Sequence, residues 1–126
     1  MKGFLRERHK EGEKLPTRHY SSQQEKEVAK TFGGQTQKNS GATLFAKGDV
    51  KLDNFLLECK TKTSHSESMS IKKEWLEKNR SEALFVGKKY NALAFNFGPN
   101  EENFYIIDES LFEYLIEYLK YIEEEK

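Results

Sequence analysis

The sequence predicts a single α/β domain in which a mixed β-sheet is flanked by helices, and three observations support this fold class. The chain has 126 residues, enough for one hydrophobic core. Segments with helical and with strand-like hydrophobic periods alternate in the order αβββαβββα. Nine Phe, six Tyr and one Trp supply the bulky apolar side chains that unstructured chains lack.

The first and the last helix are indicated by capping boxes, in which a Ser and a Glu three residues later bond the free N–H groups of the first turn. The first helix begins at Ser22 and ends at Gly33, where a glycine pair stops it. The last helix begins at Ser110 and continues to about Glu123. Its wide apolar face is expected to lie in the core.

A middle helix over residues 71–80, with Ser70 as its N-cap, separates two groups of predicted strands. Each group consists of short apolar runs bounded by turn-forming residues. The stretches 35–42 and 61–70 are polar and are expected to be loops. The predicted strands cover residues 43–45, 49–52, 55–61, 83–86, 92–97 and 103–107.

Charge is balanced overall but segregated along the chain. Lys and Arg number 21, as do Asp and Glu, so the total gives no support for a basic nucleic-acid-binding domain. Residues 1–20 are net basic and are interpreted as an N-terminal arm, with the domain proper over 21–126. Residues 108–126 carry seven acids against two lysines. The lysine-rich stretch 30–73 can therefore form a positive face, with DNA affinity that falls steeply with salt.

Other classes are disfavoured by what the sequence contains. No apolar run approaches the roughly 18 residues of a membrane span, so no membrane association is expected. The first residues are charged and have no apolar segment typical of a signal peptide. A single cysteine suits a reducing compartment. A cytoplasmic location follows as an expectation.

The stretch 49–60 carries the strongest local signal, a β-hairpin with a two-residue turn at Asp53-Asn54. That turn pairs residues whose numbers sum to 107, and residues opposite or two apart share a face. One face then collects apolar side chains, namely Val50, Leu52, Phe55, Leu57 and Cys59. The other face collects Asp49, Lys51, Leu56, Glu58 and Lys60. A one-residue slip would destroy this sorting, which supports the register.

The register places two carboxylates, Asp49 and Glu58, directly opposite each other. Like charges in that position are destabilising unless a cation lies between them. Two hard carboxylates suit Mg²⁺, which keeps its remaining positions for water and phosphate oxygens. Lys60 shares their face. The alternative is a solvated outer face that carries mixed charge.

The spacing of these residues resembles the PD-(D/E)xK nuclease superfamily. Asp49 follows a glycine, where the family name expects Pro, and eight residues separate it from the run Glu58-Cys59-Lys60. The helix with Glu25, the turn at 40–42 and the helix that follows Ser70 are similar to those of phage, archaeal and RecU-type Holliday junction resolvases. The resemblance covers about residues 21–97.

The resemblance implies a restriction-endonuclease-like fold and a Mg²⁺-dependent DNA endonuclease, with Mn²⁺ as a plausible substitute. Asp49 and Glu58 would be metal ligands together with the backbone carbonyl of Cys59. Lys60 would orient the attacking water and stabilise charge on the phosphate. Glu25 would complete the metal site, with Glu27 as the neighbouring alternative.

The expected partner is four-way junction or other branched DNA, cut by a homodimer, in the host cytoplasm if the gene is carried by a phage. Two alternatives remain open: another nuclease of the superfamily that cuts duplex, flap or mismatched DNA, and a non-catalytic DNA-binding module. A soluble α/β domain with charged outer strands is a third. Candidate DNA contacts are Lys38, Ser40, Lys47, Lys51, Lys62, Lys72 and Lys73, with Ser40 equally compatible with an ordinary turn.

Overall fold

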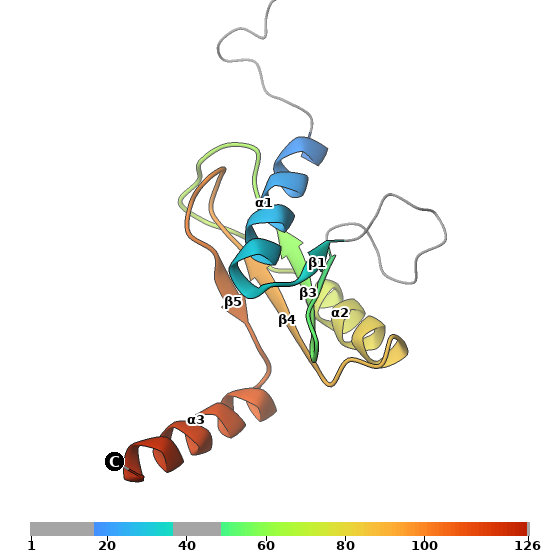
Figure 1. Cartoon of the computed structure of the whole chain (residues 1–126). Helices are drawn as coiled ribbons and strands as arrows, with labels where there is room; N and C mark the ends of the chain where they lie inside the picture. Colours follow the sequence, from blue (N-terminus) through green and yellow to red (C-terminus); the bar gives the residue numbers. More distant parts are fainter. Residues whose placement is uncertain (1–16, 37–48, 126) are drawn as a thin grey trace, which may run out of the picture.

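A five-stranded mixed sheet, in the order β1-β2-β3-β4-β5, organises the chain in the computed structural model, which describes residues 17–36 and 49–125 (Figure 1). Together with three helices the sheet forms a small α/β domain, as predicted. The elements are α1 (Thr17–Phe32), β1 (Gln35–Thr36), β2 (Asp49–Lys51), β3 (Phe55–Lys60), α2 (Lys73–Phe85), β4 (Tyr90–Phe95), β5 (Phe104–Ile106) and α3 (Glu109–Glu124).

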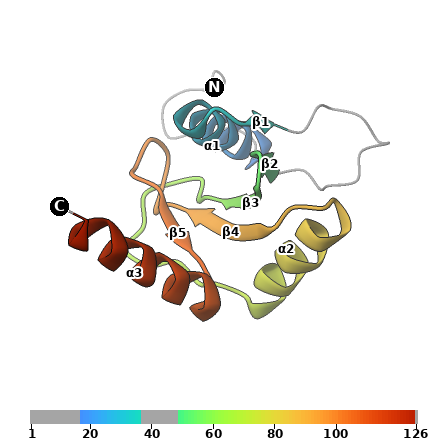
Figure 2. The ribbon, with the colours of Figure 1, turned by 60° about the horizontal axis from the view of Figure 1, so that its bottom comes forward.

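One strand pair, β3 with β4, is parallel, and the other neighbours are antiparallel. A parallel pair needs a long crossover connection, which α2 provides. Figure 2 shows α1 on one face of the sheet and α2 on the other. The sheet is thus covered on both faces next to its central strands.

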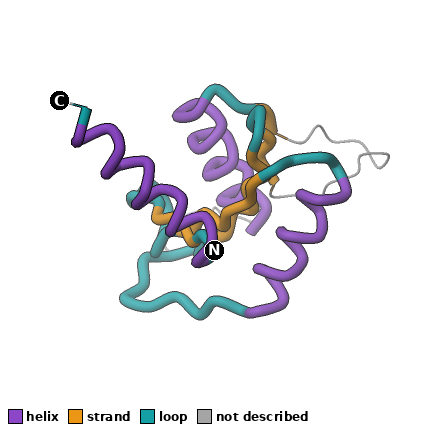
Figure 3. Tube along the Cα trace, turned by 90° about the horizontal axis from the view of Figure 1, so that it is seen from below, coloured by secondary structure: helices purple, strands orange, loops and turns teal. Residues whose placement is uncertain are grey.

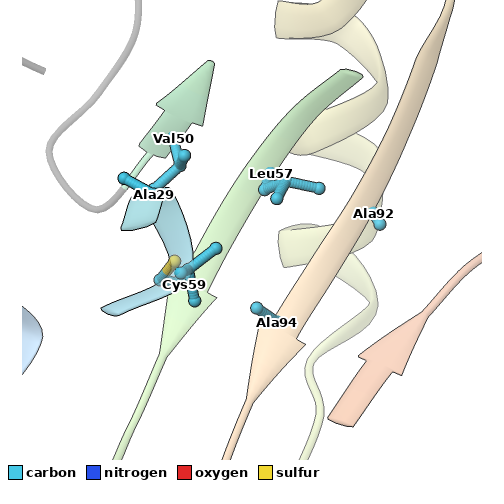
Figure 4. Close-up of a cluster of buried hydrophobic side chains, with 7 residues drawn as sticks. Ala29, Val50, Leu57, Cys59, Ala92 and Ala94 are labelled. Atoms are coloured by element: carbon cyan, nitrogen blue, oxygen red, sulfur yellow. The ribbon is translucent and has the colours of Figure 1, made fainter. Parts of the chain in front are cut away.

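The hairpin β2–β3 has the predicted register. Asp49 pairs with Glu58, and Val50 pairs with Leu57. The apolar face of the hairpin packs against α1 in a cluster of buried apolar side chains, shown in Figure 4. Full burial of such side chains stabilises the fold by roughly 1.5–3 kcal/mol each. The members of this core are Val28, Ala29, Val50, Leu57, Cys59, Ala92 and Ala94.

The first helix begins earlier than its capping box predicts. It starts at Thr17 instead of Ser22, so residues 17–20 belong to the domain and not to the arm. Gln24, inside the predicted capping box, is 2% exposed and anchors this part of the helix to the sheet. Such tertiary contacts outweigh a local capping preference. Its predicted end is confirmed, because Gly33 has a φ of 71° and stops the helix. The remaining arm, residues 1–16, and the predicted strand 43–45 lie outside the described residues.

Two further boundaries differ near the sheet. Residues 35–36, predicted as part of a loop, form the edge strand β1 and pair with Lys51 and Val50. The middle helix has Lys72 as its N-cap residue in place of Ser70, and it extends to Phe85. The strand predicted at 83–86 is therefore wrong, because a short apolar run does not distinguish a strand from a helix that continues.

The last helix begins at Glu109 and is capped by Asp108, whose side chain accepts a hydrogen bond of 2.9 Å from the Leu111 N–H. The predicted cap at Ser110 is thus wrong by two residues. Strands β4 and β5 lie within two residues of their predicted bounds. No helix among residues 17–36 and 49–125 has the length and apolar character needed to cross a bilayer.

The prediction that the apolar face of α3 lies in the core is wrong. Leu111 is the residue of this helix that is buried. Figure 1 and Figure 3 show α3 extending away from the sheet, apart from α1 and α2. Most of its large apolar side chains therefore face solvent.

Candidate metal centre

Three carboxylates from three elements, β2, β3 and α2, meet on the face of the sheet opposite α1. Asp49 and Glu58 lie side by side on the hairpin, as their register predicts. The third, Glu82, comes from the last turns of α2. One carboxylate oxygen from each lies within 4.8 Å of the others. Asp49 is 0% and Glu58 3% exposed, so these are buried acids and not a solvated acidic patch.

A buried amide fixes α2 over this face. Asn79 is 1% exposed and donates to the Leu56 carbonyl at 3.3 Å. Its own carbonyl oxygen accepts from Asn91 at 2.9 Å. Because Asn79 precedes Glu82 by about one helical turn, these bonds to β3 and β4 also fix where Glu82 points. The acid that completes the group is therefore held by the fold and not by a mobile loop.

Two lysines flank the acids. The Lys60 ammonium lies 3.3 Å from Oε2 of Glu58, as its place two residues along the strand predicts. The Lys78 ammonium lies 3.7 Å from Oε1 of Glu58 and 3.1 Å from Oε2 of Glu82. Lys60 also lies 4.5 Å from the centre of the Trp75 ring. Three acids and two cations are thus packed into one small site.

The electrostatics of the site favour a proton in the absence of a cation. Burial, followed by the charges of Glu82 and Glu58, raises the pKa of Asp49 from 3.8 to about 8. The charge of Lys78 opposes this shift. Burial by itself lowers the pKa of Lys78, but its hydrogen bond to Glu82 and the three acidic charges raise it overall. Lys78 therefore stays charged beside the acids.

The donor set fits a hard divalent cation. Both carboxylate oxygens of Asp49, with Oε1 of Glu58 and Oε1 of Glu82, are buried and receive no hydrogen bond within the described part of the chain. Buried polar atoms are almost always satisfied, so these need a partner. Oxygen ligands around Mg²⁺ at about 2.1 Å lie roughly 3–4 Å apart. A small closure of the three carboxylates would bring them to that spacing.

The structure does not bring Glu25, the predicted helix acid, into this group. Glu25 lies on α1, which packs on the opposite face of the sheet (Figure 2). Burial, with the charges of Glu25, Asp49 and Glu58, raises the pKa of the Cys59 thiol. The thiol is 5% exposed and belongs to the core. The position expected for a helix acid is taken instead by Glu82.

Glu82 and Lys78 were missed because the predicted middle helix ends at residue 80. With that boundary, Glu82 falls between a helix and a strand and has no defined direction. The pair is nevertheless visible in the sequence, because a Lys and a Glu four residues apart on a helix are neighbours. Its 3.1 Å contact confirms that spacing.

The predicted DNA contacts are dispersed around the site. Lys51 is half-buried on β2, and Lys62 donates to the Ser66 hydroxyl at 3.4 Å. The Lys72 ammonium lies 5.9 Å from the centre of the Trp75 ring, which Lys60 also contacts. Lys73 pairs with Glu77 at 3.9 Å on the exposed side of α2. The remaining candidates, Lys38, Ser40 and Lys47, lie outside the described residues.

Replacing Gln24 by Leu should destabilise the fold by about 2–3 kcal/mol. The Gln24 amide donates to the Lys60 carbonyl at 2.9 Å, to Asn103 Oδ1 at 3.0 Å and to the Ala94 carbonyl at 3.4 Å. Loss of the amide leaves these buried acceptors with fewer donors. The neighbouring Gln23→Leu variant removes an exposed hydrogen bond to Asn100 and should change the free energy of unfolding by at most about 0.5 kcal/mol. Urea denaturation of both variants tests the difference.

The parts of this site suit reactions of anionic, oxygen-rich substrates. Three carboxylates can hold a hard cation, and a lysine at the rim can stabilise charge that develops on a phosphoryl oxygen. Comparison of the chain with protein-family models, with curated proteins and with solved structures found no match.

Proposed function

We propose that the protein is a Mg²⁺-dependent nuclease that hydrolyses phosphodiester bonds in DNA. The observation that carries the proposal is the buried group of Asp49, Glu58 and Glu82, whose inner oxygens have no hydrogen-bond donor among the described residues, with two lysines beside it. A purely structural acid cluster would be satisfied by its neighbours. In this cluster the inner carboxylate oxygens remain available as metal ligands. The Lys60 ammonium lies beside them, where it could contact a phosphate.

Each side chain then has a defined role. Asp49, Glu58 and Glu82 hold the metal, and the Cys59 carbonyl is the further ligand that the family resemblance implies. When bound, Mg²⁺ activates water as a nucleophile and neutralises charge on the phosphate. Lys60, 3.3 Å from Glu58, orients that water and donates to a phosphate oxygen. Lys78 pairs with Glu58 and Glu82 and balances part of the negative charge of the site.

We further propose membership of the PD-(D/E)xK superfamily, with a restriction-endonuclease-like fold and a four-way junction as the substrate. The arrangement of Asp49, Glu58 and Lys60 on one hairpin, next to a parallel strand, supports the superfamily. The choice of junction over linear duplex rests on the similarity of the first and middle helices and of the turn at 40–42 to those of resolvases.

The test is a cleavage assay with four-way junction, linear duplex and single-stranded DNA, each with and without Mg²⁺. The unaltered protein should introduce symmetric nicks in the junction when Mg²⁺ is present. Asp49→Asn should reduce cleavage at least about 100-fold, because the amide cannot replace a charged oxygen ligand. The matched control Asp53→Asn alters an exposed acid in the turn of the same hairpin and should retain full activity.

Each outcome of this assay decides one part of the proposal. Equal cleavage of linear duplex would contradict the junction preference and retain the nuclease. Binding of DNA without Mg²⁺-dependent cleavage would contradict the nuclease and favour a DNA-binding module. Loss of activity in both Asp49→Asn and Asp53→Asn would show that the hairpin, and not the metal ligand, is responsible.

A further inference from the structure

The outer surface of α3 is the largest apolar feature that the fold leaves uncovered. One end of the helix is anchored, because Leu111 is buried and Tyr114 stacks on Tyr90 with ring centres 6.4 Å apart. The remaining apolar side chains point into solvent. We define the α3 face by five of these residues, each 37–55% exposed: Phe112, Leu115, Ile116, Tyr118 and Leu119.

The size and composition of the α3 face match a protein–protein interface. At these exposures the five side chains present roughly 400–450 Å² of surface, since a single aromatic side chain accounts for 150–250 Å². The largest apolar patch of a monomeric protein is typically about 300–600 Å², and each partner in a standard interface buries about 800 Å². The helix alone therefore provides about half of one side. Tyr and Phe, two of the five residues, are enriched in interface cores.

Most charges of α3 lie on one stripe, away from the α3 face. Glu109, Glu113 and Glu117 follow one another at intervals of four residues, and Lys120 and Glu124 fall on the same stripe of the helix. Glu123, four residues after Leu119, is the exception and lies at the C-terminal end of the α3 face. Two copies of the helix that meet through their α3 faces would direct the acidic stripes outward to solvent, so the pairing avoids most of the repulsion that the acidic composition alone would suggest.

We propose that the homodimer expected from the sequence forms through α3, so that the α3 face binds the α3 face of a second copy of this chain. Two other occupants fit less well. Residues 1–16 contain only four large apolar side chains, Met1, Phe4, Leu5 and Leu15, too few to cover the face. A lipid surface is disfavoured because helices that lie on membranes carry Lys and Arg on their polar side, and this stripe is acidic. The proposal does not depend on the proposed nuclease activity.

Sedimentation equilibrium of the full chain tests the proposal. The unaltered protein should sediment at about twice 14.8 kDa at tens of micromolar. Leu119→Glu should weaken the dimer at least about tenfold, because it places a charge in the apolar interface. Lys120→Gln is the matched control, with the same change in net charge on the adjacent, polar-stripe residue, and it should leave the dimer intact. Circular dichroism should show unchanged helix content in both variants.

A cross-linking experiment keeps the test independent of the folding of Leu119→Glu. Tyr118 lies near the middle of α3, so its two copies approach each other in either orientation of the helix pair. Tyr118→Cys should form a disulfide-linked dimer on mild oxidation, and Glu117→Cys, on the acidic stripe, should not. The native Cys59 is buried and does not compete.

Three results would overturn the inference. The first is a monomer for the unaltered protein throughout the concentration range. The second is a dimer that Leu119→Glu does not weaken, which would place the interface elsewhere. The third is a monomer that binds vesicles containing anionic lipid, which would assign the α3 face to a membrane surface.

Discussion

Replacement of Glu82 by Gln should lower Mg²⁺-dependent DNA cleavage by about 10²–10³-fold. Glu82 supplies one of the three carboxylate oxygens that lie within 4.8 Å of one another. The amide retains the shape of the side chain but loses the charge that the cation needs. Asn79, which holds α2 against β3, is unchanged in this variant, so the fold should be preserved.

The matched control is Glu25→Gln, the substitution of the acid that the sequence places in the metal site. Because Glu25 lies on α1, across the sheet, its replacement should alter cleavage by less than about threefold. Equal losses in the two variants would contradict the assignment of Glu82 as the third ligand. A readout that needs no DNA is the rise in melting temperature on adding Mg²⁺ or Mn²⁺, which follows from binding to the folded state. This rise should disappear in Glu82→Gln and persist in Glu25→Gln.

Asp49→Asn should stabilise the metal-free protein by about 2–3 kcal/mol at pH 9 and by less than about 1 kcal/mol at pH 5. The pKa of Asp49 is about 8 in the folded chain and 3.8 in its ordinary state. Between these values the folded state binds a proton that the unfolded state has released, so the free energy of unfolding falls as pH rises through this window. The difference in pKa corresponds to at most about 6 kcal/mol, and relaxation of the site reduces the cost.

The measurement is urea denaturation in EDTA at pH 5, 7 and 9, compared between the unaltered protein and Asp49→Asn. The difference between the two should be small at pH 5 and should increase through pH 7 to pH 9. Asp53→Asn, at the exposed turn, should follow the unaltered protein at each pH. A constant difference across the range would show that Asp49 does not carry the pH dependence.

The part of the site that lies on one hairpin could be predicted from the sequence. A two-residue turn and strict alternation determine which residues face each other, so Asp49, Glu58 and Lys60 follow from local geometry alone. Their observed pairing confirms that prediction. These interactions need no knowledge of the rest of the chain.

The remainder depends on contacts between distant segments. Glu82 joins the site because α2 continues beyond residue 80 and is fixed over the sheet. It is fixed by the hydrogen bonds that Asn79 makes to Leu56 and Asn91, which are distant in the sequence. Similarly, α1 continues through Ser22 instead of beginning there, and Gln24 bonds this part of the helix to the sheet. The apolar pattern of α3 predicts that one face of the helix is buried. The pattern does not specify which surface covers that face.

The position of Trp75 gives the site an intrinsic optical probe. It is the single tryptophan of the chain and lies half-buried beneath the ammonium groups of Lys60 and Lys72. An indole responds in emission wavelength and intensity to a cation over its ring. Any ligand that draws Lys60 away from the ring should therefore change the fluorescence of the protein. Occupancy of the centre can be followed in real time by this signal, with no label and no substitution.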